Sequence, residues 1–133
     1  MSGDIGSDLL KRLEMIREDI IMRAENALKR ASDAGADAMR HNISTRPTTW
    51  MRENRGKTGR IETGAMLEAV ESKVSKDRHS LTGEWGWIDT QKAYFLVQEN
   101  GGLNQFTGGS IEAMEALRDA SIVAQEAFAK AMR

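Results

Sequence analysis

Residues 7–44 carry one uninterrupted helical pattern, and this stretch constrains the fold more than any other. Its apolar residues recur at spacings of three and four, which places them on one helical face: Leu9, Leu13, Ile16, Ile20, Ala24, Ala27, Ala31, Ala34 and Ala38. The single proline, Pro47, is the first residue that forces an end, because proline disfavours helix at the residue before it. The pattern predicts a long N-terminal helix within residues 1–45, with Ser7 or Asp8 as N-cap.

Such a helix would be about 55 Å long at 1.5 Å per residue, farther than a compact domain of this size can cover. Gly35 is its weakest position, since glycine costs about 1 kcal/mol relative to alanine inside a helix. Two interpretations stay open. The chain folds back into a helical hairpin at residues 33–35, or a single helix, straight or bent near Gly35, reaches a neighbouring subunit.

Length, cysteine content and charge limit the possible functions. A chain of 133 residues is expected to form one domain, residues 1–133. It has no cysteine, which excludes disulfides, thiolate metal sites and cysteine nucleophiles and fits a reducing cytoplasm. The net charge of -1 gives no overall attraction to nucleic acid, and no apolar run is long enough to span a membrane. We expect a soluble protein with no membrane contact.

Residues 46–62 are predicted to form a basic loop or arm, opposed only by Glu53 and Glu62. A solvated loop is the simpler interpretation. Trp50 favours an interface, because an exposed tryptophan in a loop commonly anchors binding. The candidate residues for contact with a partner protein or DNA are Arg46, Trp50, Arg52, Arg55, Lys57 and Arg60.

The centre, residues 63–110, holds the strand-like sequence. Two or three antiparallel strands are predicted in residues 70–90, from segments 70–77 and 81–89 joined by a polar hairpin turn. Residues 93–99 form either a further strand or a short helix. The glycine-rich loop that follows matches neither the P-loop nor the dinucleotide fingerprint, so we expect no nucleotide cofactor and a loop that orders on assembly.

Residues 111–132 show a second helical pattern, for which Ser110 is the expected N-cap. A two- or three-stranded antiparallel sheet needs helices packed on it to be stable. The prediction is therefore an α+β fold, with a long N-terminal helix, a small antiparallel β-sheet and a C-terminal helix packed on the sheet.

Residues for catalysis or metal binding are sparse. His41 and His79 are far apart in the sequence, and neither has a carboxylate nearby at the spacing of metal ligands. A zinc site needs three or four ligands. The serines lack a nucleophile elbow, and the helical carboxylates have lysine or arginine nearby, as on a solvated surface. We expect no catalytic residue, no metal and no enzymatic activity.

Two motifs in the centre carry a family resemblance. The first is Thr63-Gly64-x-x-Leu67, and the second is Tyr94-Phe95-x-Val97-x-Glu99-x-Gly101. In this order and spacing they resemble the signatures of a neck and tail-component family of long-tailed bacteriophages, over roughly residues 58–132. The sequence departs from the family pattern at Ala69, where serine is expected, and at Gly102, where threonine is common. It also lacks the Pro-Phe pair that is common at the entry to the family's C-terminal helix. The resemblance implies structural roles for Thr63, Gly64, Leu67, Tyr94, Glu99 and Gly101.

This resemblance implies a non-enzymatic virion protein, made in the cytoplasm of the bacterial host. Members are head–tail connector or tail-completion subunits that form a ring, commonly a hexamer, between the head-closure ring and the tail terminator or tube. The implied partners are further copies of the chain, those neighbouring ring and tube proteins, and genomic DNA passing through the channel. The alternative is a small nucleic-acid-binding or regulatory module that uses the basic arm, residues 46–60, although duplex binders usually carry a broad basic surface.

Overall fold

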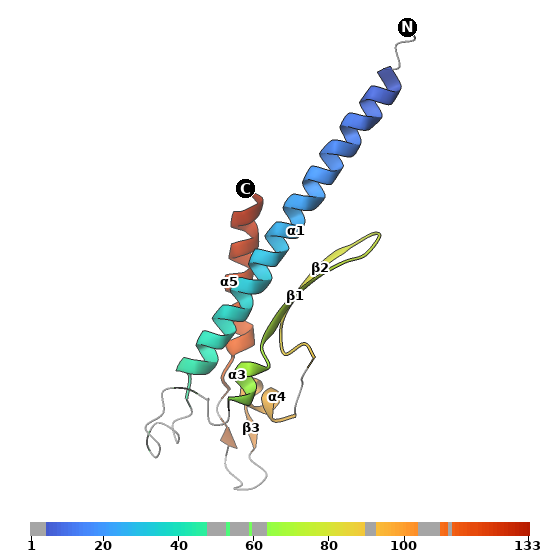
Figure 1. Ribbon diagram of the computed structural model, residues 1–133. Coiled ribbons are helices and arrows are strands. Elements are labelled where there is room, and N and C mark those ends of the chain that lie inside the picture. Colours follow the sequence, from blue (N-terminus) through green and yellow to red (C-terminus); the bar gives the residue numbers. More distant parts are fainter. Residues whose placement is uncertain are drawn as a thin grey trace.

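The structure is a computed structural model that describes residues 5–47, 53, 59, 64–89, 93–103, 110–111 and 113–133. Its elements are α1 (Ile5–Thr45), α3 (Ala65–Glu68), β1 (Glu71–Lys76), β2 (Leu81–Gly86), α4 (Ala93–Asn100), β3 (Gly102–Leu103), β4 (Ser110–Ile111) and α5 (Ala116–Met132). Figure 1 shows α5 and the β1–β2 hairpin lying beside the long helix α1. The predicted α+β fold is confirmed.

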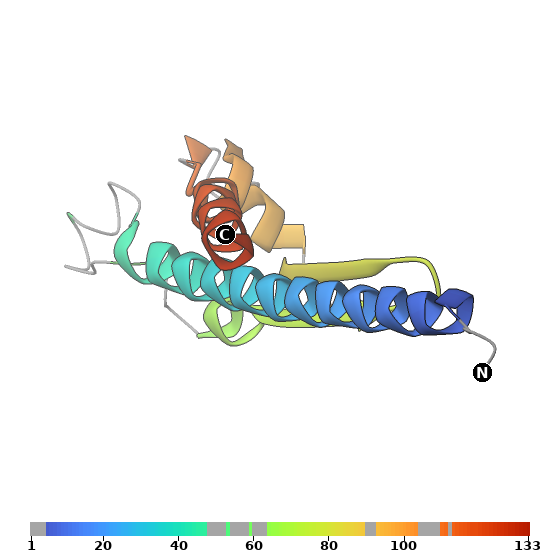
Figure 2. The ribbon, with the colours of Figure 1, turned by 90° about the horizontal axis from the view of Figure 1, so that it is seen from above.

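Helix α1 is continuous over 41 residues, so the helical hairpin at residues 33–35 is wrong. Figures 1 and 2 show it as one rod whose N-terminal half projects past the C-terminal end of α5. All its buried residues lie between Ala27 and Ile43. The C-terminal half of α1 therefore belongs to the core, and the N-terminal half extends away from it.

The β1–β2 hairpin follows α1 toward the N-terminus. Its strands pair antiparallel from Glu71↔Gly86 to Lys76↔Leu81, and the Asp77 N–H closes the turn by donating to the Ser80 carbonyl over 2.8 Å. The predicted hairpin is thus confirmed with two strands. Glycines let it approach the helix, since a Cβ at Gly83 would lie 2.6 Å from Ser32 Oγ. Gly35 of α1 likewise lies directly against Trp85, so it serves close packing.

Strand β2 ends at Gly86, three residues before the predicted end of the segment at Asp89. Gly86 has a φ of 118°, a conformation that L side chains rarely adopt, and the chain turns there. Trp87 then enters the core, where its indole N–H donates to the Met66 carbonyl over 3.0 Å. The pairing with β1 therefore ends where the chain turns into the core.

Residues 93–99, for which a strand and a helix were both open, form helix α4. The ends of the glycine-rich loop pair as β3 and β4, with Gly102↔Ile111 and Leu103↔Ser110 as partners. Residues 104–109 lie outside the described residues, so the ordering of this loop on assembly stays a prediction.

The C-terminal helix begins at Ala116, five residues later than predicted. Ser110 lies in β4 and is therefore not its N-cap. Glu115, in the left-handed region at φ 52°, turns the chain into α5. From there α5 packs along α1, and Leu117 Cδ1 lies 3.1 Å from where a Cβ at Gly86 would be, at the end of the sheet.

The core lies where the C-terminal half of α1 meets α3, α4 and α5. Its largest fully buried side chains are Phe95, Met39 and Ile43. Trp87 packs on Phe95 with ring centroids 5.0 Å apart, an aromatic contact that adds to the free energy of burial. The core therefore joins both ends of the chain to its centre.

Candidate functional site

The first resemblance motif surrounds the start of α3. Gly64 precedes this helix with a φ of 77°, where a residue with a Cβ would be strained. Leu67 is half-buried and packs against the core cluster. Thr63 lies outside the described residues. The described part of this motif therefore shapes the backbone and fills the core.

Glu99, in the second motif, holds the start of α5. Glu99 is 5 % exposed, and its carboxylate accepts the Leu117 N–H at 2.6 Å (Oε1) and 3.0 Å (Oε2), and the Arg118 N–H at 3.4 Å. These N–H groups have no partner within α5, so an acidic group from α4 caps the helix in place of a local N-cap. The sequence signal for this contact is the motif glutamate itself, although it lies 18 positions before Leu117.

Burial raises the pKa of Glu99 above its ordinary value of 4.5, because the charged form loses hydration. The backbone N–H groups of Leu117 and Arg118 partly offset this rise by stabilising the charge. Asp119 and Glu115 add repulsion and raise the pKa further. The carboxyl is therefore a titratable group inside the junction of α4 and α5.

Gly101 completes the same junction. It follows α4 with a φ of 79°, the left-handed conformation with which glycine commonly ends a helix. The returning chain then bonds to the end of α4, with the Met114 N–H donating to the Gln98 carbonyl over 2.8 Å and the Glu115 N–H to the Glu99 carbonyl over 3.1 Å. Tyr94 lies in α4. The structure thus brings Glu99 and Gly101 together at the entry to α5.

Arg46, the first residue of the predicted arm, binds the same entry. Its guanidinium donates to the Met114 and Glu115 carbonyls over 3.1 and 3.2 Å and forms an ion pair with Asp119. These contacts tie the end of α1 to the start of α5. The other arm candidates, Trp50, Arg52, Arg55, Lys57 and Arg60, lie outside the described residues, and their contact with a partner or DNA stays a prediction.

Asn42 also joins α1 to α5, and the sequence patterns did not single it out. Its side-chain amide is buried and donates to the Ala116 carbonyl over 3.1 Å. Sequence offers one signal for such a residue, a polar position within an otherwise apolar helical face. Asn42 follows Ala38 at a spacing of four, so it falls on that face.

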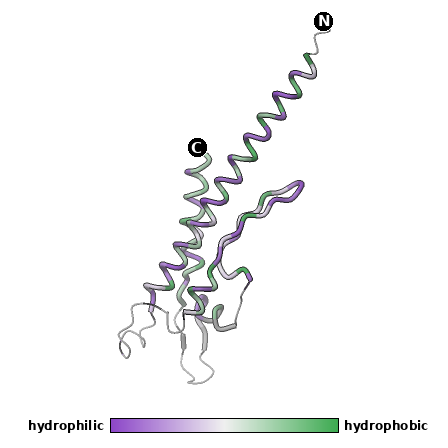
Figure 3. The backbone as a smooth tube through the Cα atoms, in the orientation of Figure 1, coloured by the Kyte–Doolittle hydropathy of each residue, from purple (hydrophilic) through white to green (hydrophobic). Residues whose placement is uncertain are grey.

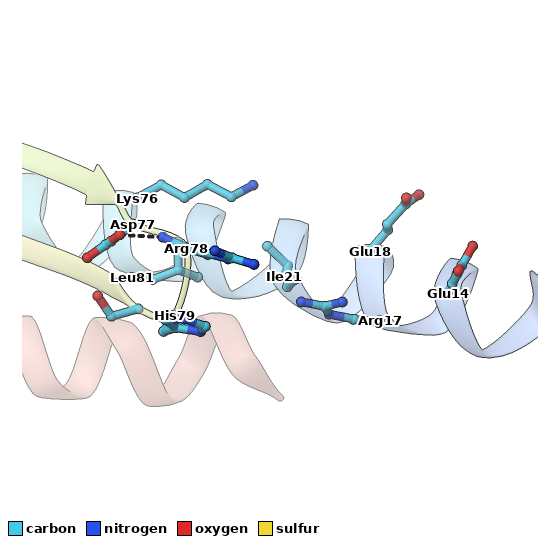
Figure 4. A pocket seen from close by; sticks show the side chains of 10 residues that line it. Glu14, Arg17, Glu18, Ile21, Lys76, Asp77, Arg78, His79 and Leu81 are labelled. Carbon is cyan, nitrogen blue, oxygen red and sulfur yellow. Dashed lines mark hydrogen bonds between the residues drawn. The ribbon is translucent and has the colours of Figure 1, made fainter. Parts of the chain in front are cut away.

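A cleft of about 710 Å³ lies between the N-terminal half of α1 and the tip of the β1–β2 hairpin (Figure 4). Its lining mixes both signs of charge: Glu14, Arg17, Glu18, Ile21, Lys76, Asp77, Arg78, His79, Ser80 and Leu81. The Lys76 ammonium lies 2.9 Å from Glu25 Oε1 at the base of the hairpin tip. Among the described residues, no group of three or more His, Cys, Asp or Glu could hold a metal ion.

The projecting half of α1 exposes a series of large apolar side chains. Figure 3 colours the apolar positions along this part of the backbone green. More than half of the surface of each is accessible: Ile5, Leu9, Leu10, Leu13, Met15, Ile16, Ile20 and Met22. Exposed apolar side chains that share one helical face, as Leu9, Leu13, Ile16 and Ile20 do by their spacing, form a candidate interaction surface. Of the large apolar side chains exposed in the part of the chain that the structure describes, eight lie on this half of α1 and four on α5.

Comparison of the chain with models of protein families, with curated proteins and with solved structures gives no match. Among the described residues, no helix is long and apolar enough to cross a lipid bilayer. The chain's own residues are therefore the basis for any function proposed for it.

Proposed function

We propose that the chain is a structural virion protein of the neck of a long-tailed bacteriophage. It acts there as a ring-forming subunit that joins head to tail, or completes the tail, between the head-closure ring and the tail terminator or tube. Its partners are neighbouring copies, commonly six in a ring, and the proteins of those adjoining structures. Its place of action is the virion, after synthesis in the host cytoplasm.

The observation that carries the proposal is the role of the second motif at the entry to α5. The residues through which the sequence resembles the neck family, Glu99 and Gly101, are those that fix this junction in the fold. Gly64 and Leu67 likewise fix the start of α3. Residues that determine backbone path and packing are expected to recur in proteins of the same fold. Their role here supports the proposed membership of the neck family.

The exposed surface of α1 supports the same proposal. A ring forms when one patch of a subunit contacts a different patch of its neighbour, so each subunit must expose at least two adhesive surfaces. The projecting half of α1 supplies one of them. The predicted basic arm, residues 46–62, would supply a contact with a neighbouring ring or with DNA in the channel.

The test is interruption of the gene for this chain in the phage that encodes it. We expect infected cells to accumulate DNA-filled heads and separate tails, counted by electron microscopy, and we expect added purified protein to restore joining. A variant with Gly101→Val, which is strained at this φ, should fail to restore it. Joined, infectious particles that lack the protein would overturn the proposal.

The nucleic-acid alternative is tested on the isolated protein. Absence of any shift of random duplex DNA at low salt would remove this alternative, and a neck subunit should appear in purified virions. A salt-dependent shift together with absence from virions would favour the regulatory module, because phosphate contacts weaken steeply with salt.

A further inference from the structure

Four apolar side chains on the projecting half of α1 form a narrow stripe, which we call the α1 stripe: Leu9, Leu13, Ile16 and Ile20. Each is between 52 % and 55 % exposed. Their spacings of four, three and four residues are those of the core positions in a two-helix coiled coil, with Leu13 and Ile20 at a and Leu9 and Ile16 at d. The stripe therefore has the geometry to receive another helix.

The α1 stripe continues a face that the protein already buries. Seven residues after Ile20 comes Ala27, which is 1 % exposed, and Ala31 follows at the next turn with 7 %. Successive positions at this spacing lie one above another on a helix. One face of α1 is thus covered from Ala27 onward and uncovered before it.

Helix α5 ends close to the point where the uncovered part begins. The Asn42–Ala116 hydrogen bond places the start of α5 beside residue 42 of α1, and α5 runs back along α1 toward its N-terminus (Figure 1). Since both helices rise by about 1.5 Å per residue, the 17 residues of α5 reach as far as roughly residue 26 of α1. A second helix laid on the α1 stripe would extend the layer that α5 starts.

The charges beside the α1 stripe favour a second copy of α1 as the partner helix and an antiparallel direction for it. In this heptad Arg12 and Asp19 occupy g positions and Arg17 an e position. In an antiparallel pair of identical helices g faces g, so Arg12 lies opposite Asp19 of the second copy, and this pair occurs twice. In a parallel pair g faces e, and Arg12 would lie opposite Arg17 of the second copy, which is repulsive.

We propose that the α1 stripe is a homodimerisation site, at which the N-terminal halves of α1 from two copies pack antiparallel about a two-fold axis near residues 14 and 15. Leu13 of each copy then packs beside Ile16 of the other, and Leu9 beside Ile20. The contact is isologous, since the same patch is used by both copies. It does not rest on the proposed virion function, and it describes the free protein, in which no ring neighbour covers the projecting half of α1.

The first test is the mass of the full-length protein in solution, by sedimentation equilibrium over a range of concentrations. We expect a reversible dimer, and we expect Leu13→Glu with Ile16→Glu to leave a monomer. The matched control is Met15→Glu, because Met15 is 68 % exposed but lies on another side of α1. Thermal unfolding followed by circular dichroism verifies that each variant keeps the fold.

A wild-type protein that stays monomeric at hundreds of micromolar would overturn the proposal. So would an oligomer of any size whose mass is unchanged by the double glutamate variant, or one that Met15→Glu disrupts equally. Absence of the protein from virions would sink the proposed function and leave the dimer intact, so failure of one proposal is distinguishable from failure of the other.

The second test addresses direction. Asp19→Arg should weaken the dimer by about tenfold, because both copies of the Arg12 contact become repulsive, and adding Arg12→Asp should restore it. Because the chain has no cysteine, single cysteines report proximity cleanly. We expect Leu9→Cys mixed with Ile20→Cys to form the crosslink on oxidation. Efficient crosslinking of Leu9→Cys to itself would show a parallel pair and overturn the antiparallel assignment.

Discussion

Trp85 of β2 lies so close to Gly35 of α1 that a Cβ at the glycine would be 2.6 Å from Cδ2 of the indole. The helix accepts a residue of low helical propensity at this position because the hairpin needs the space. Gly35 is therefore a contact residue in the middle of a continuous helix.

Gly35→Ala should lower the free energy of unfolding by about 1–2 kcal/mol, because overpacking against Trp85 at about 2–3 kcal/mol outweighs the gain of about 1 kcal/mol in helical propensity. Chemical denaturation measures this change. Gly6→Ala is the control, since Gly6 also lies in α1 with no heavy atom within 4 Å of its Cβ position, and it should not destabilise the protein. A Gly35→Ala protein as stable as the wild type would contradict the close packing.

Glu99→Gln should change how stability depends on pH. Because the folded pKa is raised above 4.5, the unfolded chain loses this proton first as the pH rises, so the free energy of unfolding falls between pH 4.5 and the raised folded pKa. Glutamine cannot titrate, and this part of the fall should disappear in denaturation curves across that window. Glu71→Gln, at an exposed position in β1, should preserve it. An identical pH dependence for wild type and Glu99→Gln would refute the assignment.

Asn42→Ala should lower the free energy of unfolding by about 1–3 kcal/mol, since it removes the buried amide that joins α1 to Ala116 of α5. The matched variant is Asn26→Ala, at an exposed position of the same helix, which should change stability by no more than about 0.5 kcal/mol. Equal midpoints for the two variants in urea would show that the Asn42 contact contributes nothing.

Two variants of the basic segment should affect different properties of the protein, stability in one case and head–tail joining in the other. Arg46→Ala should lower stability by about 1 kcal/mol, because a partly exposed guanidinium loses its contacts with the start of α5. Replacing Arg52, Arg55 and Lys57 together by serine should leave stability unchanged and reduce head–tail joining under the proposed function. Full joining by the triple variant, in a complementation assay, would remove the arm from the proposal.

Sequence reasoning succeeded where the signal is local and repeated. The spacing of apolar residues predicted a helix within residues 1–45, and α1 ends at Thr45, while the polar turn predicted the β1–β2 hairpin. It failed where a residue distant in the sequence determines how a helix begins or where a strand ends. Ser110 is a good local N-cap, but α5 is capped by Glu99 from α4, and β2 ends at Gly86, after which Trp87 is buried in the core and bonds to Met66.

The candidate surfaces show the same limit. Basic composition suggested that Arg46 belongs to an arm, yet its partners are carbonyls nearly 70 positions away that no local pattern reveals. The apolar periodicity of α1 is equal along its length. Only the position of α5 and the hairpin tells which half of that face is covered.

The continuity of α1 has an evolutionary consequence. Its buried residues all lie from Ala27 to Ile43, while the exposed large apolar residues lie before them on the same rod. Mutations in the first half should therefore change the exposed surface with little effect on folding, whereas mutations in the second half are subject to selection for the core. The first half of α1 can therefore vary in evolution while the second half is held constant by the core.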